Sequence, residues 1–157
     1  MRVCTRVVLV IAAGFSPLAR SAEADFSKVP GAVVAHSPAS SKVYLGSPGI
    51  CILPDGTRLA KCDLFGPGAP RECGSVSHVF RSSDRGETRE LMCALRGLFW
   101  AGIFPHRGDV YLPGTGGTTG RELVIRRSTD GGRTGTDPVD DQSGRLRAEG
   151  VHRSSSG

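Results

Sequence analysis

The chain has 157 residues, enough for one domain of ordinary size, and a formal net charge of +5 at pH 7. Its twenty basic side chains are scattered, and Arg126 and Arg127 form the only adjacent pair. Because no basic run carries interleaved aromatic residues, the composition argues against a nucleic-acid partner. Glycine (22) and proline (10) make up about a fifth of the chain, a share that is below that of low-complexity disordered sequences.

The first 24 residues have the three-part layout of a secretory signal peptide. A basic start with Arg2 and Arg6 precedes the apolar run 7–15, and small residues then occupy positions 22 and 24. We therefore expect cleavage near Ala24 and a secreted or periplasmic product. The apolar run is too short to span a bilayer as a helix, so no membrane span is expected after cleavage. A buried N-terminal strand is the alternative interpretation of the same run.

Four cysteines remain after that cleavage, namely Cys51, Cys62, Cys73 and Cys93. Their spacing matches no usual zinc signature, so we expect neither a metal site nor a cofactor. In an oxidising compartment four cysteines allow three pairings. A bridge between Cys51 and Cys62, on adjacent predicted strands, competes with the interpretation of each cysteine as a buried free thiol.

Short β-type runs separated by turn residues predict an all-β architecture. The clearest hairpin has strands 50–53 and 57–60 around the turn 54–56, where Asp55-Gly56 favours a turn because glycine adopts positive φ without steric cost. Residues 76–81 form the next predicted strand.

The pattern then restarts at residue 99. Runs 99–104 and 109–112 flank a predicted turn at 105–108, and 122–127 is the following strand. Helical periodicity is weak throughout; residues 87–96 are the best candidate, and the turn residues at their start argue against a helix.

Two seven-residue segments, 82–88 and 128–134, share the pattern Ser-x-Asp-x-Gly-x-Thr and begin 46 residues apart (residue 82 to residue 128). The carboxylate and the hydroxyls can bond backbone N–H groups of a tight hairpin, and the glycine supplies a conformation that other residues resist. The matching residues are Ser82, Asp84, Gly86, Thr88, Ser128, Asp130, Gly132 and Thr134. The spacing is typical of a propeller blade.

This pattern resembles the Asp-box, or bacterial neuraminidase repeat (BNR), of the sialidase (neuraminidase) superfamily. The resemblance covers about residues 40–136 and implies a partial β-propeller, about two blades of a six-bladed sialidase-like propeller. It also implies that Asp84 and Asp130 are turn formers on hairpins away from a catalytic face. The family's pattern closes with an aromatic residue, whereas Arg89 and Gly135 follow the two motifs here, so both lack a core anchor.

We therefore divide the chain into four parts. These are a signal peptide (1–24), an N-terminal extension (25–39), the sialidase-like blades with their two Asp-boxes (40–136) and a tail (137–157). The tail carries few apolar residues, and we expect it to be poorly ordered. Since only two blades are recognisable, the chain is interpreted as a truncated piece of a longer propeller.

The resemblance implies a glycosidase chemistry, in which three arginines bind a substrate carboxylate, a Tyr–Glu pair is the nucleophile and an aspartate is the acid/base. The first arginine commonly precedes the first hairpin, where this chain has Gly46. Asp63 is the acid/base candidate and Glu72 the weaker alternative. A strand-end cap or a turn is the favoured competing interpretation of Asp63.

Two functions follow from these residues. The first is a fragment of a secreted exo-α-sialidase-like glycoside hydrolase, acting on sialylated or related glycans and inactive as it stands. The alternative is a non-catalytic Asp-box propeller module that binds glycan or protein. Trp100, the sole tryptophan, is either a sugar-stacking platform or, as favoured, a core residue. Arg81, Arg126 and Arg127 are expected on solvated strand faces.

Overall fold

The computed structural model describes residues 25–69, 76–116 and 122–147. A first antiparallel sheet contains β1 (Tyr44–Ile52), β2 (Arg58–Phe65), β3 (Val76–Ser82) and β4 (Glu90–Arg96), in that order. A second contains β5 (Leu98–Phe99), β6 (Phe104–His106), β7 (Asp109–Gly116), β8 (Glu122–Ser128) and β9 (Arg145–Arg147). In the described residues the one helical element is a short 3-10 turn, η1 (Ala39–Ser41).

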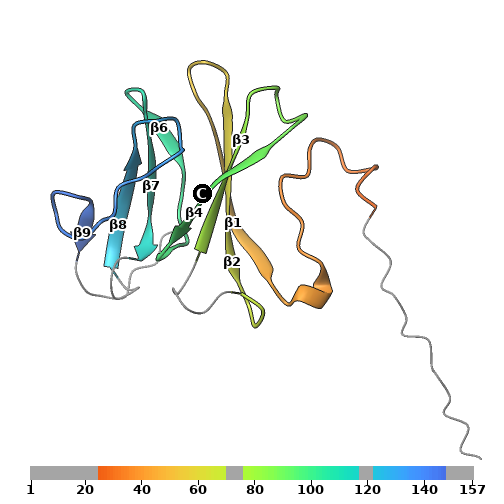
Figure 1. The fold of residues 1–157 in the computed structure, drawn as a ribbon, viewed down its shortest axis with the longest axis horizontal. Coiled ribbons are helices and arrows are strands. Elements are labelled where there is room, and N and C mark those ends of the chain that lie inside the picture. Colours follow the sequence, from red (N-terminus) through yellow and green to blue (C-terminus); the bar gives the residue numbers. More distant parts are fainter. Residues whose placement is uncertain (1–24, 70–75, 117–121, 148–157) are drawn as a thin grey trace, which may run out of the picture.

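Each sheet is an antiparallel meander in which strands that follow one another in sequence lie side by side. In the second sheet β5 and β6 both pair with β7, so together they form a single interrupted first strand. Figure 1 shows the two sheets side by side, with the N-terminal segment on the side of the first sheet that faces away from the second. The prediction of an all-β fold is confirmed, and the two neighbouring antiparallel sheets, which do not close on one another, are consistent with the predicted partial β-propeller.

The first strands of the two sheets are interrupted at corresponding places. In β1 the pairing register shifts between Gly46 and Gly49, and Ser47 between them has φ 45°. In the second sheet the interruption falls between β5 and β6, where Trp100 has φ 49°. The expected continuous strand 99–104 is therefore wrong, because the chain turns out of the sheet at Trp100 and rejoins it at Phe104.

The hairpin predicted around Asp55-Gly56 is confirmed. Ile52 pairs with Arg58, the Leu53 N–H donates to the Thr57 carbonyl at 2.8 Å, and Gly56 has φ 83°. The four-residue turn predicted at 105–108 is shorter than expected. Its first half belongs to β6, and only Arg107 and Gly108 form the turn, both at positive φ.

Part of the expected tail pairs with the second sheet. β9 pairs with β8, and the Ile125 N–H donates to the Gly144 carbonyl at 2.8 Å. A turn before β9 is closed by Ser143, whose N–H donates to the Asp140 carboxylate at 2.7 Å. Backbone pairing in the second sheet thus continues past residue 136, as far as Arg147. The rest of the tail and the signal-peptide segment lie outside the described residues.

The apolar core lies between the two sheets. It is made of buried side chains from both of them: Cys51, Leu59, Val79, Leu98, Ala101, Ile103, Val110, Leu112 and Val124. The outer face of the first sheet is different, since Ile50, Ile52 and Leu91 are all exposed there. Within the described part of the chain, no helix has the length and apolar character to cross a membrane.

Candidate functional site

Asp63, the acid/base candidate, lies inside β2 with its side chain fully buried between the sheets. Its carboxylate accepts hydrogen bonds from Lys61 Nζ at 2.7 Å, from Ser77 Oγ at 2.5 Å and from the Trp100 N–H at 2.8 Å. Each bond comes from a different segment, so Asp63 ties β2 to β3 and to the interruption between β5 and β6. The competing expectation of a strand-end cap or a turn is wrong, because Asp63 is paired on both sides within the sheet.

One buried polar group, which we call the junction, consists of Lys61, Asp63 and Ser77. Lys61 Nζ also donates to the Ala101 carbonyl at 2.7 Å, and Ser77 Oγ lies 3.1 Å from the Leu98 carbonyl. Burial lowers the pKa of Lys61, and the contact with Asp63 opposes that shift. The junction is therefore a hydrogen-bonded polar insert in the core that joins the two sheets.

Gly46 stands where the resemblance expects an arginine, and the structure leaves little room for a side chain there. A Cβ added at Gly46 would lie 2.8 Å from Cε1 of Phe65. Because Phe65 is a bulky ring at the end of β2, an arginine at this position requires the ring to move. Glu72, the weaker catalytic candidate, lies outside the described residues.

Four aromatic side chains, which we call the aromatic row, lie in contact along one end of the sheets: Tyr44, Phe65, Phe99 and Trp100. Successive ring centroids are 5.5, 6.2 and 5.1 Å apart. Tyr44 (51%), Phe65 (40%) and Trp100 (43%) are all substantially exposed. The favoured expectation of a core role for Trp100 is therefore wrong, since its ring is open to solvent.

The strand registers place the aromatic row and the two Ser-x-Asp-x-Gly-x-Thr loops at opposite ends of the sheets. Tyr44 pairs with Phe65 at one end of the first sheet, whereas Arg58 pairs with Ser82 at the other. In the second sheet Leu98 pairs with Gly116 at the end that carries the row. Contiguous exposed aromatic surface of this kind marks a binding site more often than isolated apolar residues do.

The first box loop (82–88) is closed by its own side chains. Ser82 Oγ accepts from the Gly86 N–H at 2.7 Å and contacts Asp84 Oδ1 at 2.8 Å. The Thr88 N–H donates to Asp84 at 2.9 Å, and its hydroxyl donates to the same carboxylate. The hydroxyl and N–H bonds from Thr88, followed by the bond from Ser82, hold the pKa of Asp84 well below its ordinary range.

The second box loop (128–134) repeats this pattern. Ser128 Oγ accepts from the Gly132 N–H at 2.9 Å, and Asp130 accepts from the Thr134 hydroxyl at 2.6 Å and from its N–H at 2.9 Å. These bonds from Thr134 hold the pKa of Asp130 below its ordinary range. Both carboxylates thus accept hydrogen bonds from residues of their own loops.

The two residues that follow the box loops have different environments. Arg89 is exposed, and its Nε donates to the Val34 carbonyl of the N-terminal segment at 3.2 Å. A Cβ added at Gly135 would have ordinary contacts at 3.9 Å or more, with Leu95 among the neighbours. Arg126 differs from its expected solvated position, because it is buried and donates to the Arg96 carbonyl at 2.8 Å.

Cys51 and Cys62 are buried free thiols, and Cys93 is a partly buried free thiol. Burial raises the pKa of all three thiols, which disfavours the reactive thiolate form. The conceivable bridge between Cys51 and Cys62 is absent, and Cys73 lies outside the described residues. Among the described residues, no group of three or more His, Cys, Asp or Glu side chains could hold a metal ion.

Sequence reasoning singled out Asp63 but predicted neither its burial nor its partners. A signal was present in β2, where Lys61 and Asp63 follow the apolar Leu59 at every second position and therefore lie on the same face of the strand. It missed the aromatic row because Tyr44, Phe65 and Phe99 are far apart in sequence and meet only through strand pairing.

No protein-family model matches the chain, and no curated protein matches it. Two solved structures are similar to it: Trypanosoma rangeli sialidase, and the same enzyme in complex with the inhibitor DANA. Each has 15% sequence identity and a TM-score of 0.45, over 55% of this chain and 13% of the sialidase chain. The chain thus spans a small part of the length of the structures that it resembles.

Proposed function

We propose that this chain is a secreted, sialidase-like portion of a β-propeller that binds carbohydrate along the aromatic row and does not hydrolyse it. The aromatic row carries the proposal. Partly exposed rings can stack on the apolar face of a pyranose, and the Tyr44 hydroxyl can bond its hydroxyls. The two box loops, which match the Asp-box pattern, support the sialidase-like assignment. The glycan we expect is sialylated or closely related.

The absence of turnover is proposed on two grounds. A general acid must reach the proton acceptor on its substrate, and Asp63 is fully buried with its carboxylate already bonded to Lys61 and Ser77. A carboxylate-binding arginine is also missing at Gly46, where Phe65 fills the space. Glycan binding without chemistry therefore agrees best with the described residues.

Trp100 offers a direct test because it is the only tryptophan in the chain and belongs to the aromatic row. Titration of the purified chain with sialyllactose should shift the tryptophan emission. The same titration with lactose should show how much the sialic acid contributes to the affinity. By calorimetry, Trp100→Ala should weaken binding about 3- to 10-fold, the range expected for loss of one aromatic contact. Hydrolysis of 4-methylumbelliferyl sialic acid should stay at background.

Phe104→Ala is the matched control. Phe104 is exposed to a similar extent (42%), comes from the same stretch of chain, and packs on Tyr111 away from the aromatic row. It should bind sialyllactose like the unchanged chain. Equal losses in both variants, or no binding of any glycan by the folded chain, would remove the carbohydrate proposal. Measurable hydrolysis would remove the claim of inactivity and restore the glycosidase interpretation.

A further inference from the structure

A cavity of about 230 Å³ lies on the outer face of the first sheet, on the side opposite the core. Its floor is apolar and is formed by Ile50, Ala60 and Phe80, which are paired in register across β1, β2 and β3. The N-terminal segment forms its other wall through Ala32 and Val34. The cavity is thus built from three strands and a covering segment, and it is separate from the aromatic row.

Four arginines line this cavity, and three of them have no ion-pair partner among the described residues. These three are Arg58 of β2, Arg85 of the first box loop and Arg89, which immediately precedes β4. Of the two carboxylates in this loop, Asp84 is hydrogen-bonded to Thr88, and Glu87 forms no ion pair with a described residue.

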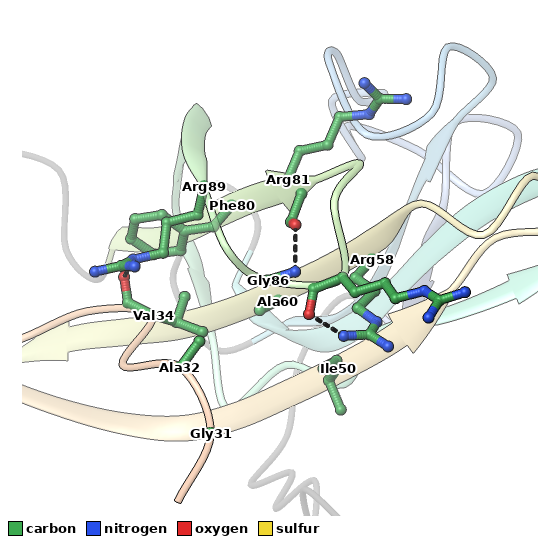
Figure 2. A pocket seen from close by; sticks show the side chains of 12 residues that line it. Gly31, Ala32, Val34, Ile50, Arg58, Ala60, Phe80, Arg81, Gly86 and Arg89 are labelled. Atoms are coloured by element: carbon green, nitrogen blue, oxygen red, sulfur yellow. Dashed lines mark hydrogen bonds between the residues drawn. The ribbon is translucent and has the colours of Figure 1, made fainter. Parts of the chain in front are cut away.

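Two of these side chains, Arg58 and Arg89, donate to backbone carbonyls, and their other N–H groups bond no described residue. Arg58 Nη1 donates to the Arg85 carbonyl, and Arg89 Nε donates to the Val34 carbonyl at 3.2 Å. Figure 2 shows the guanidinium groups of Arg58 and Arg89 on either side of the apolar lining, and the Arg81 side chain running away from the other labelled residues. Arg81 instead donates to Thr57 Oγ1 at 3.1 Å.

Guanidinium groups fixed beside an apolar floor suit an organic anion. Arginine N–H groups match the oxygen atoms of carboxylate and sulfate, and such charge-assisted bonds are stronger than neutral ones. The volume is below that of a typical drug-sized pocket, so the ligand must be small. We propose that this cavity binds a carboxylated or sulfated monosaccharide unit, with the oxyanion on Arg58 and Arg85 and the ring over Ile50, Ala60 and Phe80.

The test uses glucuronate as the carboxylate probe and glucosamine 6-sulfate as the sulfate probe, each added to the full chain and followed by calorimetry. Glucose is the neutral control, and inorganic sulfate is the control for anion binding without a ring. At least one acidic sugar should bind more tightly than both controls, and its affinity should fall as salt increases. The stronger of the two acidic sugars identifies the preferred oxyanion.

Arg85→Gln should weaken that binding roughly tenfold, the effect of losing one charged hydrogen-bonding partner. Arg107→Gln is the matched control, because Arg107 is also an exposed arginine at positive φ in a hairpin turn but lies outside the cavity. Equal losses in both variants, or equal binding of inorganic sulfate and the sugars, would overturn the proposal. Trp100→Ala should leave this binding unchanged, so failure here is distinguishable from failure of the aromatic-row proposal.

Discussion

Gly46 affects both the local packing and the position at which the resemblance expects a carboxylate-binding arginine. The Phe65 ring occupies the space beside Gly46, and the same ring contacts Tyr44 at 5.5 Å and Phe99 at 6.2 Å. A side chain at Gly46 therefore disturbs the middle of the aromatic row. Replacing this glycine by arginine would not restore a carboxylate-binding group without displacing Phe65.

Gly46→Ala should destabilise the chain by up to about 1 kcal/mol, because its Cβ would lie 2.8 Å from the Phe65 ring and would push that partly exposed side chain away from its preferred rotamer. Gly102→Ala is the control: the nearest atom to its added Cβ is in Pro113, at 3.8 Å, and its backbone does not require positive φ. That variant should be neutral or more stable by up to about 1 kcal/mol. Urea unfolding of both variants measures the difference, and equal stabilities would refute this account of Gly46.

The two box loops have the same internal hydrogen bonds but different surroundings. The second is packed on the first sheet: a Cβ added at Gly132 would lie 3.1 Å from Leu59, and the Gly132 carbonyl accepts from the Cys93 thiol at 3.6 Å. The first contacts the N-terminal segment, with Ala32 lying 3.6 Å from a Cβ added at Gly86. The motif therefore determines the shape of each loop. The place of the loop in the fold determines how much the stability of the chain depends on that loop.

Asp130→Ala should lower the midpoint of thermal unfolding more than Asp84→Ala does. Both changes leave the threonine N–H of the loop without its carboxylate acceptor, but only the second box loop packs against the core residue Leu59. Calorimetric melting at pH 7 compares the two variants. Equal shifts, or a larger shift for Asp84→Ala, would contradict this assignment.

The lowered pKa values of Asp84 and Asp130 predict that the stability of the chain depends on pH. Because the pKa of Asp84 and that of Asp130 are lower in the folded chain than in the unfolded one, their contribution to stability is fully present above the ordinary aspartate value of about 3.9. It is lost progressively as the pH falls below that value. The double variant Asp84→Asn/Asp130→Asn should therefore lose less stability than the unchanged chain between pH 5 and pH 2, measured by urea unfolding at each pH.

At the scale of the whole molecule, the junction makes the two sheets a single unit. Lys61 and Asp63 come from the first sheet, yet they bond the Ala101 carbonyl and the Trp100 N–H at the interruption of the second. Both side chains are fully buried. Loss of one partner leaves a buried charge without compensation, which is far more costly than loss of both.

Asp63→Asn should cost about 3–5 kcal/mol of stability, because it leaves the Lys61 ammonium buried and unpaired. The double variant Lys61→Met/Asp63→Asn should recover part of that loss. If the effects of the two substitutions were simply additive, no stability would be recovered. Unfolding in urea followed by Trp100 fluorescence and by circular dichroism should give coincident transitions in the unchanged chain. Two separated transitions would show that the sheets unfold independently.

Local patterns in the sequence were enough to predict the first hairpin, β3, β8 and the shape of the box loops, since each depends on contacts within a few residues. The interruption at Trp100 could not be predicted, because the partner that holds its N–H is Asp63, 37 residues earlier. β4 and β9 were missed for a similar reason. Their sequences alternate weakly, and pairing with β3 and β8 decides their conformation.

The sequence separation between hydrogen-bonded residues, which is short in the box loops and long in the junction, affects the order of folding. The box loops close through bonds that span at most four residues, whereas the bonds of Lys61 and Asp63 to the second sheet span 40 and 37 residues. Closing a long segment costs more chain entropy than closing a short one. The loops and hairpins should therefore form early in folding, and docking of the two meanders through the junction should be the late step.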